Sequence, residues 1–252
     1  MAILMPSHLL VLLTALGPAR AAVATMAGLL LCTSLVAAQP AAEPVRPGLR
    51  ESDDGRDYAQ VEQLVIQGLL APDQDSAKAL FQESVACARV LVAMAPADPQ
   101  AHYLLSVALG YQLEHEGLRK KLVIAAEARA EAEQALELEP GHAGAHHVMG
   151  RLHAAAMRLN RVARLVAREI LGASVLEGAS WERAEFHFKQ AALNDPSSPR
   201  HAMELGALYI DTGRPAMARV VLTEAARLAL REPSDPLATA RVRVLLAQLA
   251  LE

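Results

Sequence analysis

One local pattern recurs along this chain: a helix end, a proline turn, and a second helix that carries a glycine. The first copy runs through residues 135–140, Ala-Leu-Glu-Leu-Glu-Pro, and reaches Gly150, while the second runs through residues 190–196 and reaches Gly206. A recurring helix–turn–helix unit is typical of an α-solenoid, in which each unit buries its apolar face against its neighbours. Because solenoids present a binding groove, the pattern predicts a scaffold or binding module.

The composition favours an all-α fold. Hydrophobic residues make up 53% of the 252 residues, much of that alanine, and aromatic residues only 3%. Alanine is the strongest helix former, and no segment shows the alternating β-branched pattern that strands need. The net charge of −4 is modest, and no Lys/Arg-rich tract suggests nucleic acid as an obligate partner. We therefore do not expect nucleic acid to be a partner.

Residues 21–38 form an uncharged apolar run directly after Arg20. The run ends in Val-Ala-Ala, small residues that suit a signal-peptidase cut before Gln39. We expect residues 1–38 to be a signal peptide, and the protein to be periplasmic or secreted. The alternative is an uncut inner-membrane anchor that leaves the rest facing the periplasm, since such a run nearly spans a bilayer. Leu31 is bulky where a lipoprotein signal before Cys32 needs a small residue, so lipidation is not expected.

Residues 39–56 combine prolines, glycines and charges, which predicts a disordered linker. Helical spacing begins near Asp57, and we expect residues 57–252 to form the repeat domain, with a terminal helix over residues 235–251 as its cap. Without the leader, Cys87 is the only cysteine, so no intramolecular disulfide can form. Its apolar neighbours predict a buried, inert thiol.

The units match the 34-residue tetratricopeptide repeat, in which a small residue on the first helix lets the second helix approach. The last unit fits almost without gaps, with Gly206 and Tyr209 on its first helix and Ala218, Leu222 and Ala225 on its second. The unit before it places Gly150 and His153 opposite Ala184, Phe188 and Ala191, and has an insert of about 22 residues near 155–178. The first of these three places Gly110 opposite Ala128, Ala132 and Ala135, with an insert of about six residues near 116–125. We predict about three and a half repeats.

Three strings together resemble the regulator of microtubule dynamics family: residues 135–151, which contain His-His-Val-Met-Gly-Arg, then Trp-Glu-Arg-Ala at 181–184, and Phe-Lys-Gln-Ala at 188–191. The resemblance covers roughly residues 103–230. It implies a tetratricopeptide-like fold and an interaction protein. It does not imply microtubule binding, because the chain departs from the family in its secretory-type leader and in the lack of aromatic residues in its insert.

Four histidines lie within twelve residues, a density from which a zinc site could be built. They are His142, His146, His147 and His153. Aligning Gly150 with the packed glycine of the repeat instead places His146 and His153 in the core. We favour packing, and a metal-dependent enzyme that uses this cluster is the weakest alternative.

The same alignment directs five residues into the concave groove, where tetratricopeptide arrays usually hold extended peptides. They are Tyr111, Glu114, His147, Arg151 and Arg200. Arginine suits a carboxylate or a peptide backbone, so we predict this set as a partner-binding patch. Solvated surface is the alternative interpretation for each of them.

The long insert is rich in arginine, and helical spacing would place four of its arginines on one face of a continuous helix over residues 145–171. The segment begins at Arg151, and the four arginines on the shared face are Arg158, Arg161, Arg164 and Arg168. Such a basic amphipathic helix over residues 151–168 could bind an anionic membrane or an acidic partner, and it could equally be a solvated outer face.

Catalytic motifs such as Gly-x-Ser-x-Gly, a phosphate loop or His-Glu-x-x-His are missing from the sequence. We therefore expect a non-enzymatic scaffold without a cofactor, which binds a protein or peptide in its groove. A membrane-tethered adaptor, using the uncut N-terminal run and the Arg-rich segment, is the alternative.

Overall fold

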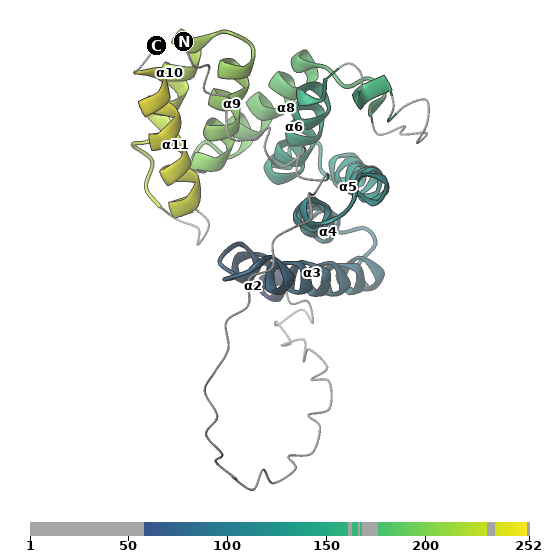
Figure 1. Ribbon diagram of the computed structural model, residues 1–252. Helices are drawn as coiled ribbons and strands as arrows, with labels where there is room; N and C mark the ends of the chain where they lie inside the picture. The colour runs from purple at the N-terminus through teal and green to yellow at the C-terminus, as the bar shows by residue number, and fades with distance from the viewer. Residues whose placement is uncertain (1–57, 161–162, 166, 168–175, 231–234, 251–252) are drawn as a thin grey trace, which may run out of the picture. The chain divides into compact units, whose positions relative to one another are not determined.

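The computed structural model describes residues 58–160, 163–165, 167, 176–230 and 235–250, all within one compact unit (Figure 1). The signal-peptide and linker predictions for residues 1–56 lie outside the described residues. Every regular element in these ranges is helical. The helices, listed in chain order, are α2 (Tyr58–Leu69), α3 (Gln74–Met94), α4 (Pro99–Gln112), the 3₁₀ turn η1 (Leu113–His115), α5 (Leu118–Leu138), α6 (Ala143–Arg158), α8 (Trp181–Asn194), α9 (Pro199–Asp211), α10 (Pro215–Ala225) and α11 (Asp235–Leu249).

Neighbouring helices pack as four pairs, α2 with α3, α4 with α5, α6 with α8, and α9 with α10. Each pair also contacts the next, through α3 and α4, α5 and α6, and α8 and α9, and α11 packs on α9 and α10. The prediction of an all-α solenoid with a C-terminal capping helix is confirmed. The described part holds four pairs, half a repeat more than we predicted from the sequence.

Turn residues explain where the helices begin. Pro99, Pro199 and Pro215 stand in the first turn of α4, α9 and α10, where the missing N–H group costs nothing. The side chain of Asp98 accepts a hydrogen bond of 3.0 Å from the Gln100 N–H group at the start of α4. Ser180 caps α8 by accepting the Arg183 N–H group at 3.2 Å. These caps fix the phase of each helix, and with it the side chains that meet the neighbouring helix.

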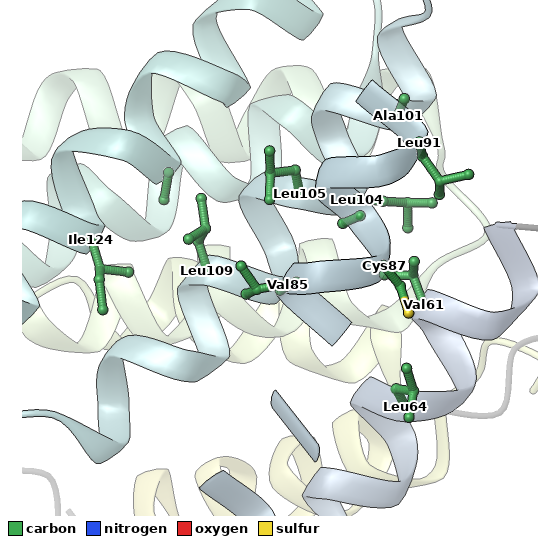
Figure 2. Packing of buried hydrophobic residues seen from close by; sticks show 13 residues of the cluster. Val61, Leu64, Val85, Cys87, Leu91, Ala101, Leu104, Leu105, Leu109 and Ile124 are labelled. Atoms are coloured by element: carbon green, nitrogen blue, oxygen red, sulfur yellow. The ribbon is translucent and has the colours of Figure 1, made fainter. Parts of the chain in front are cut away.

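Aliphatic side chains from the first four helices form one continuous core (Figure 2). Val61 on α2, Leu91 on α3, and Leu105 on α4 are each at most 2% exposed. Cys87 lies in this core and is 4% exposed, which confirms the prediction of a buried thiol. A second core joins α8 to α11 through Phe188, whose ring is fully buried.

The glycine positions correct one part of the predicted register. A Cβ atom added to Gly150 would lie 2.5 Å from the Phe188 ring, and one added to Gly206 would lie 2.5 Å from Leu222, so both are packed as expected. A Cβ on Gly110 would meet nothing within 4 Å. Gly150 and Gly206 each lie ten residues after the proline of the turn, and the same offset from Pro96 reaches Ser106, which is fully buried.

Ser106, and not Gly110, is therefore the position in α4 that corresponds to the packed glycines. Choosing Gly110 displaced the predicted register by one helical turn. With Ser106 in its place, this unit is about ten residues longer than a 34-residue repeat, instead of six. The additional length includes the 3₁₀ turn η1, which lies between α4 and α5.

The prediction of a continuous Arg-rich helix is also wrong. Helix α6 ends at Arg158, because Leu159 has an extended backbone with ψ of 135° and Asn160 then caps a separate helical segment by accepting the Ala163 N–H group at 2.7 Å. Asparagine favours such caps over helix interiors. Arg158 instead forms an ion pair of 2.8 Å with Asp211 on α9. Arg161 and Arg168 lie outside the described residues.

None of the described helices is both long and apolar enough to cross a membrane.

Candidate functional site

A cavity of about 320 Å³ opens between the first helices of the four pairs, α2, α4, α6 and α9. One wall is apolar, because α2 contributes four aliphatic side chains at helical spacing and α4 contributes aliphatic and tyrosine side chains. This wall includes Val65, Ile66, Leu69, Tyr103, Val107 and Tyr111. The other side is polar and comes from the start of α4 and the turn before α9, through Gln100, Asp195, Arg200 and His201.

Gly144 makes room for this arrangement at the start of α6. A Cβ atom there would lie 2.4 Å from the ring of Tyr103, so the absence of a side chain lets that ring stand against α6. Tyr103 is half-buried and also packs against the small core cluster of Val148 and Met149. The ring is thereby fixed at the edge of the cavity, between the second and third helix pairs.

The structure brings three of the five predicted groove residues together. Arg151 Nη2 lies 3.5 Å from Glu114 Oε1, and the Arg151 guanidinium carbon lies 5.8 Å from the centre of the Tyr111 ring. Arg151 Nε also lies 3.7 Å from Glu204 on α9. Burial alone would lower the pKa of Arg151, but Glu204, Tyr111 and Glu114 together raise it. Arg151 is therefore held as a cation between two carboxylates.

The other two predicted residues, His147 and Arg200, meet around His201. The Nδ1 atoms of His147 and His201 are 3.0 Å apart, so one ring donates a hydrogen bond and the other accepts it. Burial and then the charge of Arg200 lower the pKa of His201 to about 4. Burial, His201 and the nearby arginines lower the pKa of His147 well below its usual range. Both rings are neutral at pH 7, a state that fits their shared hydrogen bond.

Only Tyr111 and Arg200 of the predicted five line the cavity itself. Sequence reasoning missed the wall from α2, together with Glu204 and His201. Glu204 lies one helical turn after Arg200, and this spacing could have identified it once α9 was assigned. The wall from α2 had no such signal, because aliphatic residues at helical spacing equally predict a core face.

The histidine cluster resolves into separate structural roles. His146 and His153 are 7% and 4% exposed, which confirms their predicted burial. His146 Nε2 lies 2.9 Å from the Pro140 carbonyl oxygen, and its Nδ1 lies 2.9 Å from His187 Nδ1. His142 caps α6 by accepting the Ala145 N–H group at 3.1 Å. Among the residues the structure describes, no three His, Cys, Asp or Glu side chains are placed to hold a metal ion.

Comparison with known proteins gives one family. The model of the regulator of microtubule dynamics protein 1-3 family matches residues 59–250, which is most of the chain and nearly all of its described part. No curated protein sequence matches. One solved structure with similarity is a thermophilic TPR protein of Thermus thermophilus, at 18% identity and a TM-score of 0.45, covering 76% of this chain and 100% of that one.

Proposed function

The chain belongs to the regulator of microtubule dynamics protein 1-3 family, and on that premise we propose that it is a non-enzymatic scaffold that holds a peptide or protein segment. The observation that carries the proposal is the 320 Å³ cavity. All four first helices border it, so a ligand there would touch every helix pair at once. Its mixture of a broad apolar wall and a few polar groups is typical of sites that bind ligands by complementarity.

The matched residues Leu69 and Leu70 provide the test. Leu69 lines the cavity and is 36% exposed, whereas its neighbour Leu70 is 66% exposed and is not among the lining residues. Leu69→Glu places a carboxylate on the apolar wall, and we expect it to reduce capture of the natural partner at least tenfold in affinity purification with crosslinking. Leu70→Glu should capture the partner as the wild type does, and both variants should retain their helical circular dichroism.

Equal capture by Leu69→Glu and the wild type would overturn the groove as the binding surface. Substitutions at Arg151 and Tyr111 make a poorer test. Arg151→Glu would set a third carboxylate beside Glu114 and Glu204, and Tyr111→Ala would remove the ring that stacks on Phe81 at 5.5 Å. Loss of capture in those variants would therefore not separate binding from folding.

We also propose that the protein acts outside the cytoplasm, either free or held at the inner membrane. The support is the apolar run over residues 21–38 and the small residues before Gln39. Mass spectrometry of the native N-terminus separates the two forms. Chains that begin near Gln39 indicate the free form, and intact leaders in the membrane fraction indicate the anchored form. Intact chains in the cytosol would contradict the proposal.

A further inference from the structure

The charged side chains that line the cavity do not cancel one another. Among the described residues of the lining, two carboxylates, Glu62 and Asp195, stand against one guanidinium group, that of Arg200. His201 adds no charge at pH 7, because burial and then the charge of Arg200 lower its pKa to about 4. The lining therefore has an excess of one carboxylate at neutral pH.

Arg200 is held within the protein, and Asp195 balances its charge. The Nε atom of Arg200 donates a hydrogen bond of 3.4 Å to the Ser198 hydroxyl. Burial alone would raise the pKa of Asp195, but hydrogen bonds from Ser197 and the charge of Arg200 are among the influences that lower it. Asp195 is thus a carboxylate within the field of Arg200, and this side of the cavity needs no further charge from a ligand.

Glu62 is the carboxylate in excess, and it stands beside the apolar wall. It precedes Ile66 by one turn of α2 and Leu69 by two turns, so the three residues share one face of the helix. Glu62 itself is exposed. Because the contacts of an exposed carboxylate are weak, Glu62 can exchange them for a cation of a ligand at little cost.

The polar strip beyond Tyr111 has the same balance of charge. Arg151 lies there between two carboxylates, 3.5 Å from Glu114 Oε1 and 3.7 Å from Glu204 Oε1. The side chain of Glu114 is 54% exposed and is accessible to a segment that continues along the strip. The cavity and the strip together hold four of these carboxylates and two guanidinium groups, an excess that attracts positive charge.

We propose that the cavity recognises a basic side chain directly beside a bulky aliphatic or aromatic one, within an extended segment of a partner protein. The bulky side chain packs on the wall that includes Leu69 and Val107, and the basic side chain binds Glu62. The stem of a lysine or arginine suits this place, because it can lie along apolar surface while its charged end reaches the carboxylate. The inference rests on the proposed function and adds the chemistry of the partner.

Short capped peptides test this chemistry directly with the full chain. Four peptides of about eight residues, with Gly and Ser flanks and an uncharged fluorophore, carry Phe-Arg, Phe-Gln, Phe-Glu or Ala-Arg at their centre. In fluorescence anisotropy at low salt, we expect the Phe-Arg peptide to bind about threefold more tightly than Phe-Gln, and about tenfold more tightly than Phe-Glu or Ala-Arg. Added salt should remove most of the preference over Phe-Gln, because salt screens exposed charges.

Substitutions of single carboxylates separate a contact at Glu62 from the net charge of the protein. Glu62→Gln should reduce binding of the Phe-Arg peptide to the level of the Phe-Gln peptide. Glu83→Gln removes an equal charge from an exposed position on α3 that is not among the lining residues, and should leave binding unchanged. Glu62→Arg should reverse the preference, so that Phe-Glu binds more tightly than Phe-Arg. All three variants should retain the helical circular dichroism of the wild type.

Equal affinity for the Phe-Arg and Phe-Gln peptides at low salt, or full binding of Phe-Arg by a folded Glu62→Gln variant, would overturn the basic preference. If the Leu69→Glu variant still fails to capture the natural partner in that case, the groove scaffold stands and only its ligand chemistry is wrong. If Leu69→Glu captures the partner normally, the proposed function falls as well.

Discussion

The α4–α5 and α6–α8 pairs have the same backbone frame and different side chains at three matching positions. His102 on α4 and His146 on α6 each lie six residues after the proline of the preceding turn, and each places Nε2 at 2.9 Å from that proline's carbonyl oxygen. The second helix then supplies the partner of Nδ1. In the first case it is Glu131 at 2.6 Å, and in the second it is His187 at 2.9 Å.

The residue after that partner differs in size. It is Ala132 on α5 and Phe188 on α8, and both are fully buried. The facing position on the first helix compensates, since Ser106 stands in α4 where Gly150 stands in α6. One pair therefore combines two small residues, and the other combines a bulky ring with no side chain at all. The backbone of the repeat fixes which positions meet between two helices. The side chains at those positions then determine how each helix pair responds to mutation and to acid.

The largest expected difference comes from truncating the second helix. Phe188→Ala should lower the free energy of unfolding by about 3–5 kcal/mol, because it opens a ring-sized cavity beside Gly150, where no side chain can collapse into it. Ala132→Gly at the matching position should cost about 1 kcal/mol, mainly through helix propensity. Urea denaturation followed by circular dichroism measures both. Similar losses of stability in the two variants would show that the two helix pairs are packed alike, and would contradict the difference described above.

A single methyl group should separate two glycines that look equivalent in the sequence. Gly150→Ala places a Cβ atom 2.5 Å from the buried Phe188 ring and should destabilise by about 1–3 kcal/mol. Gly110→Ala meets open space in a helix and should stabilise by about 0.5–1 kcal/mol. Thermal melting measures the opposite signs. In a Phe188→Ala background the cost of Gly150→Ala should disappear, and a cost that persists there would place the clash elsewhere.

The glycine pair also shows what the sequence could and could not predict. The repeat, its proline turns, and the packed positions of Gly150 and Gly206 followed from helical periodicity, because a local pattern determines a local structure. Gly110 misled the alignment, since glycine is chemically the same whether a side chain faces it or not. Ser106 could be recognised only from its fixed offset after Pro96, or from its complete burial.

The groove was predictable only in part for a related reason. Tyr111, Glu114 and Arg151 come together although the predicted register of α4 was one helical turn out, because residues one turn apart lie on nearly the same face of a helix. The apolar wall from α2 and the ion pair of Arg151 with Glu204 depend on contacts between segments far apart in the sequence, which a local pattern does not reveal. Likewise the extended backbone at Leu159 ends α6 and Asn160 caps the next helical segment, although the arginine spacing around them is compatible with a continuous helix.

Acid should distinguish the same two junctions by a smaller amount. Burial and then the charges of His146, His153 and Arg183 lower the pKa of His187 to about 4, whereas an unfolded histidine titrates near 6.5. Between these values the unfolded chain binds more protons, so the stability present above pH 6.5 is lost as the pH falls toward 4. His187→Gln removes this titrating group from both the folded and the unfolded chain, and keeps a hydrogen-bonding group near His146. The variant should therefore lose about 1–2 kcal/mol less than the wild type between about pH 7 and pH 5, in urea denaturation at each pH.

Two further variants decide whether His187 causes the acid sensitivity. Arg227→Gln removes one partner of the exposed ion pair with Glu224, and its stability should depend on pH as that of the wild type does. The α4–α5 junction has a carboxylate at the matching position, so the replacement His187→Glu imports that arrangement and should lessen the loss further, because a carboxylate favours protonated His146. A slope unchanged by either substitution at His187 would contradict its role and assign the acid sensitivity to the other histidines whose pKa burial lowers, among them His147 and His201, whose shared hydrogen bond cannot survive protonation of both rings.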